Sequence, residues 1–136
     1  MARQEIKNQD YEDLLQHLKG FKYIVINTQH GGFGLTHDAQ ISYLEQSNIL
    51  YQLVDRSDRH STQRYGSLIF VNGHNWSDRN IPRDDPVLVD LVNKLGSACW
   101  GEHAALKIVQ IPADVSWQID DYDGVEWVAE QHRIWK

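Results

Sequence analysis

The stretch KGFKYIVINTQHGGFGLTHD, residues 19–38, contains the signals for a strand, a loop and a helix in succession. Ile24, Val25 and Ile26 are consecutive apolar residues, which is typical of a strand that is buried on both faces. The glycine-rich residues after this strand predict a loop, and the apolar spacing beyond it predicts a helix from about Asp38 to Gln46. The stretch therefore indicates a strand–loop–helix unit.

Two further helices are predicted on either side of this unit. Residues 10–19 predict a helix that ends before Gly20 and places four apolar residues on one face: Tyr11, Leu14, Leu15 and Leu18. Asp85 is a good N-cap and Pro86 suits the first helical position, so a helix is predicted from there to Gly96. Both helices carry apolar residues on one face, which is the pattern of an amphipathic helix.

Four more segments have the composition of strands. Residues 48–54 and 67–71 predict two strands separated by a polar loop, and residues 105–112 and 115–120 predict an antiparallel hairpin. With the last helix described below, the element order is αβαββαββα. The expected fold class is α+β, a single compact domain over residues 1–136 with a mixed or mostly antiparallel sheet of about five strands and four helices.

The C-terminal residues predict the fourth helix. Asp123 is placed as its N-cap, with Glu126 three residues later as in a capping box. One helical face carries Val125, Val128, Ala129, His132 and Trp135. Trp127 and Ile134 fall on the opposite side, so this helix either packs between two layers or contacts a second copy of the chain in a homodimer.

Composition excludes several classes of protein. The chain has 136 residues, a formal net charge of -6 and one cysteine, Cys99, so it has no internal disulfide. This charge argues against general nucleic-acid binding. No apolar run reaches the roughly 18 residues of a membrane helix, and the N-terminus lacks the apolar region of a secretory signal. We therefore expect a cytoplasmic protein that does not bind membranes.

No complete catalytic, metal or cofactor motif is present. The loop HGGFGLTH, residues 30–37, lacks both the Lys-Ser/Thr of a phosphate loop and the spacing of a dinucleotide fingerprint, so a plain turn is favoured over a phosphate site. His30 and His37, with His74 or His103, are spaced too loosely to predict a zinc site. Cys99 lies four residues before His103, but burial of this thiol is favoured over a nucleophilic role.

A few charged and aromatic residues are candidates for ligand binding. Arg83 and Asp84 precede a helix N-terminus, and Arg83 beside Trp76 would hold a phosphate and a base together; a surface pair of Arg83 with Asp84 is the alternative. Arg133 is explained least by packing, whereas His132 also suits a core position and Arg64 a solvated loop. The candidate ligand-binding residues are Arg83, Asp84, Trp76, Arg133, His132 and Arg64.

Four segments carry a resemblance to a known family. They are YIVINTQHGGFGL, IPRDDPVLVDLVNKLG, LKIVQIP and VSWQIDDYDGVEWVAEQHRIW. Over about residues 21–47 and 80–136 the chain resembles small, mostly bacteriophage-encoded proteins with RDDP and YDG…HR-W motifs. The family has no assigned activity, and the resemblance implies a phage accessory protein in the host cytoplasm that acts on host machinery or host defence.

These observations favour a non-catalytic binding protein. The expected partner is a small anionic, nucleotide-like ligand, such as a host immune signal, or a host protein. One alternative is a small hydrolase or nucleotide-cleaving enzyme that uses His30, His37, His132 and nearby acids, and another is a virion or assembly component. The sequence does not identify the ligand, the host target or the oligomeric state.

Overall fold

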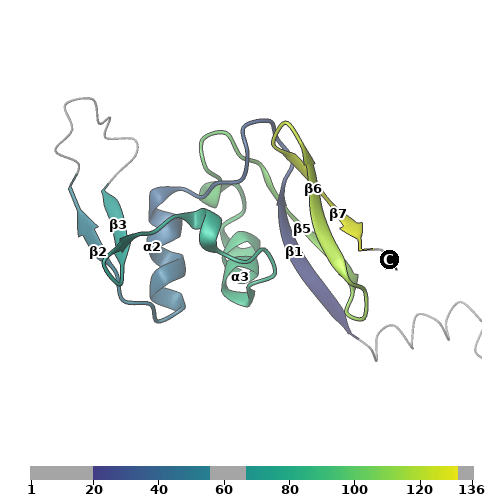
Figure 1. Ribbon diagram of the computed structural model, residues 1–136, viewed down its shortest axis with the longest axis horizontal. Coiled ribbons are helices and arrows are strands. Elements are labelled where there is room, and N and C mark those ends of the chain that lie inside the picture. Colours follow the sequence, from purple (N-terminus) through teal and green to yellow (C-terminus); the bar gives the residue numbers. More distant parts are fainter. Residues whose placement is uncertain (1–19, 56–66, 132–136) are drawn as a thin grey trace, which may run out of the picture.

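The computed structural model describes residues 20–55 and 67–131, and the fold is α+β as expected (Figure 1). The described residues form seven strands and two α-helices, with two short 3-10 helices, so they do not match the expected count of about five strands and four helices. In chain order the elements are β1 (Phe21–Asn27), α2 (His37–Gln46), β2 (Gln52–Val54), β3 (Leu68–Val71), β4 (His74–Asn75), η2 (Asp78–Asn80), α3 (Pro86–Leu95), η3 (Gly96–Cys99), β5 (Leu106–Pro112), β6 (Trp117–Tyr122) and β7 (Val125–Glu130). The helix predicted over residues 10–19 lies outside the described residues.

Strand β1 forms the middle layer of the molecule. It pairs with β5 in an antiparallel ribbon, in which Val25 lies opposite Ile108. The two helices lie on one side of this ribbon and the β6–β7 hairpin lies on the other (Figure 1). Val25 belongs to the core on the helical side, whereas the neighbouring Ile24 and Ile26 point to the other face and are also buried. The predicted burial of this strand on both faces is confirmed.

The main hydrophobic core lies between α2, α3 and the strands that they cover. Leu44 of α2 and Leu88 of α3 have no exposed surface, and Leu91 and Ile69 are nearly as buried. The sheet β2–β3–β4 contributes Ile69 from its central strand. The amphipathic spacing in each helix thus supplies a face that α2 and α3 bury against one another and against the strands.

Helix α3 begins and ends where its local sequence predicts. One oxygen of Asp85, Oδ1, accepts hydrogen bonds from the backbone N–H groups of Val87 (2.8 Å) and Leu88 (3.4 Å). Pro86 occupies the first turn, where a missing N–H group costs nothing. Gly96 adopts a positive φ of 54° at the C-terminal end. The capping prediction for this helix is confirmed.

The predicted strand pairing is wrong in two respects. Strands β5 and β6 do not form a hairpin with each other, because β5 pairs with β1 and β6 pairs with β7. The described strands also form three small antiparallel sheets, not one sheet, with the orders β1–β5, β2–β3–β4 and β6–β7. Pairing is set by contacts between distant parts of the chain, which the order of elements along the sequence does not reveal.

The predicted C-terminal helix is also wrong, because residues 125–130 form strand β7. Asp123 and Gly124 have φ values of 52° and 87°, and they form the two-residue turn that joins β6 to β7. Two successive positive φ values are typical of a type I′ hairpin turn, for which Asp-Gly is a preferred pair. Asp123 is therefore a turn residue and not an N-cap, and Trp127, 46% exposed, lies on a strand.

The central segment differs in detail from its prediction. Of residues 48–54 only Gln52–Val54 form a strand, whereas residues 67–71 are confirmed as a strand over Leu68–Val71. The connection between β3 and α3 contains the short strand β4 and the 3-10 helix η2. No helix within the described residues is long and apolar enough to cross a membrane.

Candidate functional site

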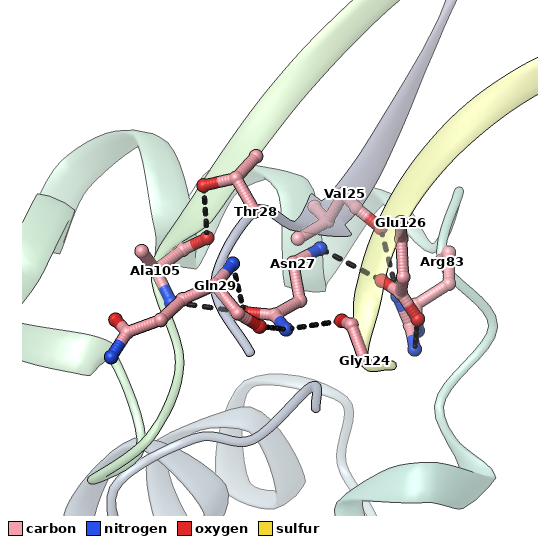
Figure 2. A network of polar contacts seen from close by, with 8 residues as sticks. All are labelled: Val25, Asn27, Thr28, Gln29, Arg83, Ala105, Gly124 and Glu126. Atoms are coloured by element: carbon pink, nitrogen blue, oxygen red, sulfur yellow. Dashed lines mark hydrogen bonds and ion pairs between the residues drawn. The ribbon is translucent and has the colours of Figure 1, made fainter. Parts of the chain in front are cut away.

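A buried asparagine organises the end of β1 (Figure 2). The Asn27 side chain is fully buried; its Nδ2 donates to the carbonyl oxygen of Gly124 (2.7 Å) and its Oδ1 accepts from the backbone N–H of Ala105 (3.0 Å). Its own backbone N–H donates to Oε1 of Glu126 (2.7 Å). Asn27 thereby joins β1, the residue before β5 and the turn of the β6–β7 hairpin. Its polar groups are satisfied, so burial costs little.

Arg83 and Glu126 form a two-pronged ion pair beside this asparagine (Figure 2). The guanidinium donates to both carboxylate oxygens, at 2.6 and 2.9 Å, and the two side chains are only 20% and 12% exposed. Arg83 also donates to the carbonyl oxygen of Val25 (3.2 Å) and accepts the N–H of Val25 on its own carbonyl (2.8 Å). These groups complete the hydrogen bonding along the edge of β1 that faces away from β5.

The same guanidinium supports the glycine-rich loop. The central carbon of the Arg83 guanidinium lies 3.8 Å from the centre of the Phe33 ring, which is a cation–π contact. Phe33 belongs to the loop of residues 28–36 that connects β1 to α2. Arg83 therefore holds three parts of the chain together: β1, the hairpin through Glu126, and this loop.

The end of the glycine-rich loop nearest α2 packs against residues 100–104. Gly101 donates its N–H to the carbonyl oxygen of Gly34 (2.8 Å). The backbone N–H of Thr36 donates to the carbonyl oxygen of Cys99 (3.0 Å). A Cβ atom at Gly101 would lie 2.8 Å from the carbonyl carbon of Gly34, which is too close for any side chain. The two backbones approach this closely because residue 101 is glycine.

Between these two segments lies a pocket of about 570 Å³, which we name the Gly–Trp pocket. This volume is in the range of small-molecule sites. Its hydrogen-bonding side chains come from both segments, and none of the described residues that line it is Lys or Arg. The lining residues are Gly31, Gly32, Phe33, Gly34, Leu35, Thr36, His37, Gln40, Trp100, Gly101, Glu102, His103 and Ala104.

Trp100 is the residue of this pocket with an unmet hydrogen-bonding need. Its indole nitrogen Nε1 is buried and has no hydrogen-bond acceptor among the residues that the structure describes. A buried donor without a partner costs about 1–3 kcal/mol, so such groups are uncommon and call for an explanation. An acceptor atom on a bound ligand would remove this cost.

A second, smaller pocket of about 280 Å³ shares two of its walls, His37 and Gln40, with the Gly–Trp pocket. It extends to the sheet β2–β3–β4 and is also lined by Trp76 and Asp78. The carboxylate of Asp78 accepts a hydrogen bond from the N–H of Leu35 (2.9 Å), which ties this side to the glycine-rich loop. The first turn of α2 thus separates two adjoining pockets.

The predicted ligand-binding residues lie in different places. Arg83 and Trp76, which were expected to lie beside each other, contact different aromatic residues: Arg83 lies over Phe33, whereas Trp76 stacks on Tyr43, with 6.0 Å between ring centres. Asp84 is exposed and lines a third pocket beside Tyr23, so it does not form the alternative pair with Arg83 either. Arg133, His132 and Arg64 lie outside the described residues.

The cysteine and the histidines that the sequence suggested as catalytic or metal-binding residues were located in the structure. Cys99 is fully buried, donates to the carbonyl oxygen of Gly96 (3.1 Å), and has its pKa raised by burial, so the prediction of a buried thiol is confirmed. His30 contacts Asp123, through its carbonyl oxygen at 3.0 Å and its carboxylate at 3.4 Å, on an exposed surface. Among the described residues, no three His, Cys, Asp or Glu side chains lie close enough together to hold a metal ion.

Two features of the site were missed by sequence reasoning. Glu126 was assigned to helix capping, and Trp100, Gln40 and Glu102 were not assigned to a site at all. The signal for the hairpin was the Asp-Gly pair between alternating apolar residues. No comparable local signal marks the pocket, because its walls come from segments that are far apart in the sequence.

Comparison of the chain with protein-family models, with curated proteins and with solved structures found no match. The resemblance to bacteriophage-encoded proteins therefore stays a prediction.

Proposed function

We propose that this protein is a non-catalytic binding protein for a nucleotide-like small molecule, which occupies the Gly–Trp pocket. The observation that carries the proposal is Trp100, a residue that lines this pocket and whose buried indole N–H has no acceptor among the described residues. A planar heterocycle with ring nitrogens or carbonyl groups supplies such an acceptor and also packs well against aromatic and glycine surfaces.

The remaining groups of the pocket suit the same class of ligand. Glu102 offers a carboxylate that accepts hydrogen bonds from the amino groups of a base. His37 and His103 offer imidazoles, which donate or accept according to their protonation. The absence of Lys and Arg from the described lining favours a ligand with few negative charges over a polyphosphate. The expected nucleotide-like ligand is thus narrowed to a nucleotide with one or two phosphates, or to an uncharged nucleoside.

The adjoining pocket gives room for the rest of the ligand. His37 opens α2, and the N-terminus of a helix attracts negative charge. A base in the Gly–Trp pocket would place its sugar and phosphate near His37, pointing toward the second pocket. In a phage accessory protein, which the sequence resemblance predicts, the ligand would be a host nucleotide signal.

The test is a titration with a panel of nucleosides, mononucleotides, and cyclic and NAD-derived nucleotides, followed by calorimetry. Trp100→Phe keeps an aromatic side chain and removes the N–H group together with the five-membered ring of the indole. Loss of one hydrogen bond of about 1 kcal/mol should weaken binding about fivefold. Trp127→Phe is the matched control, since Trp127 lies on β7 and does not line the pocket, and its affinity should equal that of the wild type.

Two outcomes would contradict the proposal. One is that no compound of the panel binds, and the other is that Trp100→Phe binds as tightly as the wild type. Compound recovered after denaturation of the complex separates binding from the hydrolase alternative. Intact compound supports capture, whereas a converted compound supports an enzyme.

A further inference from the structure

The β6–β7 hairpin has one face toward β1 and one face away from it. Side chains alternate along a strand, and the register places Glu126 and Val128 on one face and Trp127 on the other. The carboxylate of Glu126 binds Arg83 and the N–H of Asn27, so its face is turned toward β1. The face that carries Trp127 is therefore the outer face, on the side away from the helices (Figure 1).

This outer face is apolar, although the solvent face of an antiparallel sheet normally carries polar side chains. Tyr122 is 75% exposed and Trp127 is 46% exposed, and the register makes them diagonal neighbours on adjacent strands. Exposed aromatic residues that lie together mark surfaces that bind a partner. We name the set the outer hairpin face; its residues are Gln118, Asp120, Tyr122, Val125, Trp127 and Ala129.

The charge of the hairpin indicates the chemistry of that partner. Asp120 lies directly across from Trp127 on the outer hairpin face. The sequence has no Lys or Arg between Lys107 and Arg133. The same stretch contains six acidic residues, which are Asp114, Asp120, Asp121, Asp123, Glu126 and Glu130. Such a surface repels nucleic acids and anionic membranes, and it attracts a partner that is positively charged.

We propose that the outer hairpin face binds an arginine-rich segment of another protein. A guanidinium stacks on aromatic rings such as those of Tyr122 and Trp127, and its charge pairs with a carboxylate such as that of Asp120. A second copy of the chain is disfavoured as the occupant, because a two-fold dimer would bring two acidic faces together. No residue of this face lines the Gly–Trp pocket, so the proposal does not depend on nucleotide binding.

An NMR titration of the full-length, ¹⁵N-labelled chain with a twelve-residue (Gly-Arg)6 peptide tests this proposal without any substitution. The backbone amides of residues 117–130 and the indole N–H of Trp127 should shift, whereas the indole N–H of Trp100 should not. A (Gly-Glu)6 peptide of the same length should shift none of them. The proposal would be overturned by the absence of shifts, or by shifts of similar size at exposed acids elsewhere, such as Asp38 and Asp84.

Two variants measure the contribution of the aromatic rings. Trp127→Thr and Tyr122→Thr remove a ring and keep a residue that favours strands. Each should weaken the binding of (Gly-Arg)6 about threefold at a salt concentration of about 0.15 M. Tyr23→Thr is the matched control, because Tyr23 is 45% exposed but lies on β1, and this variant should bind as the wild type does. Wild-type affinity in both hairpin variants would mean that charge alone binds the peptide, which would overturn the proposal.

Light scattering of the protein without peptide decides between a basic partner and a second copy. A monomeric wild type that binds (Gly-Arg)6 at the outer hairpin face supports the proposal. A dimeric wild type that becomes monomeric in Trp127→Thr would overturn it in favour of a second copy as the occupant.

Discussion

Arg83 and Glu126 meet through two parallel hydrogen bonds, and this pair closes the edge of β1 that no strand occupies among the described residues. Glu126 accepts the N–H of Asn27, and Arg83 accepts the N–H of Val25 while donating to its carbonyl oxygen. An ion pair thus satisfies backbone groups that a further strand satisfies in an ordinary sheet. This arrangement leaves fewer free backbone groups at the edge for pairing with another chain. The Arg83–Glu126 pair therefore has a structural role.

Removing Arg83 should destabilise the fold. Arg83→Ala leaves the largely buried Glu126 carboxylate without its counter-charge, which costs about 3 kcal/mol or more of unfolding free energy. Arg83→Lys should cost less, since it keeps the charge but loses the planar fork. Denaturant unfolding measures both. Arg79→Ala, at an exposed arginine, is the control and should stay within about 0.5 kcal/mol of the wild type. An unchanged stability of Arg83→Ala would return Arg83 to the list of ligand-binding candidates.

The cap of α3 gives a second prediction. Asp85 accepts the N–H groups of the first turn and also the hydroxyl of Tyr43, at 2.7 Å. Asp85→Ala should therefore lose an N-cap and a hydrogen bond, together about 2–3 kcal/mol. The neighbouring Asp84→Ala is the matched control, because Asp84 is exposed, and it should have little effect. Equal stabilities of the two variants, measured by thermal unfolding, would show that the cap contributes nothing.

Gly73 and Gly124 occupy the same position in two hairpin turns, but their surroundings differ. Gly73 and Gly124 are each the second residue of a two-residue turn, with φ values of 77° and 87°. A Cβ atom at Gly124 would lie 2.8 Å from the backbone nitrogen of Gly32, whereas a Cβ atom at Gly73 would meet nothing within 4 Å. Both Ala variants bear the strain of a positive φ, and Gly124→Ala should lose about 1–3 kcal/mol more through the clash.

This comparison also tests the contact between the hairpin and the glycine-rich loop. Equal unfolding free energies for Gly73→Ala and Gly124→Ala would mean that the turn does not touch the loop at Gly32. A larger loss for Gly124→Ala, with weaker ligand binding, would link the hairpin to the Gly–Trp pocket through that loop.

Alkaline pH should weaken the fold through Tyr43. Burial, and then the hydrogen bond to Asp85, raise the pKa of this phenol from 10.0 to about 12. The folded state therefore favours the neutral phenol more than the unfolded state does. The resulting contribution to the free energy of unfolding is fully present below pH 10 and is lost as the pH rises from 10 to 12. About 1.4 kcal/mol should be lost by pH 11. Unfolding free energies of the wild type and of Tyr43→Phe at pH 9 and pH 11 measure it, and an equal decrease in both proteins would contradict the assignment.

Local sequence was sufficient to predict those elements for which several independent sequence signals agree. Helix α3 has an N-cap, a proline in its first turn, an apolar face and a terminal glycine, and each of these interactions lies within a few residues of the helix. Strand β1 has three consecutive apolar residues, for which burial on both faces is the simplest explanation. Burial of Cys99 likewise followed from the general preference of this residue for the core.

The sequence alone determined the α+β class, the bounds of α3 and the buried character of β1, because helix caps and apolar runs act over short distances. Only the tertiary structure decided the fate of residues 123–130, where Asp123 and Glu126 suit a helix cap as well as a hairpin. Glu126 becomes a strand residue because Arg83 and Asn27, both distant in sequence, bind its carboxylate. Strand partners and pocket walls are chosen by such long-range contacts, whose free energy exists only once the chain has folded.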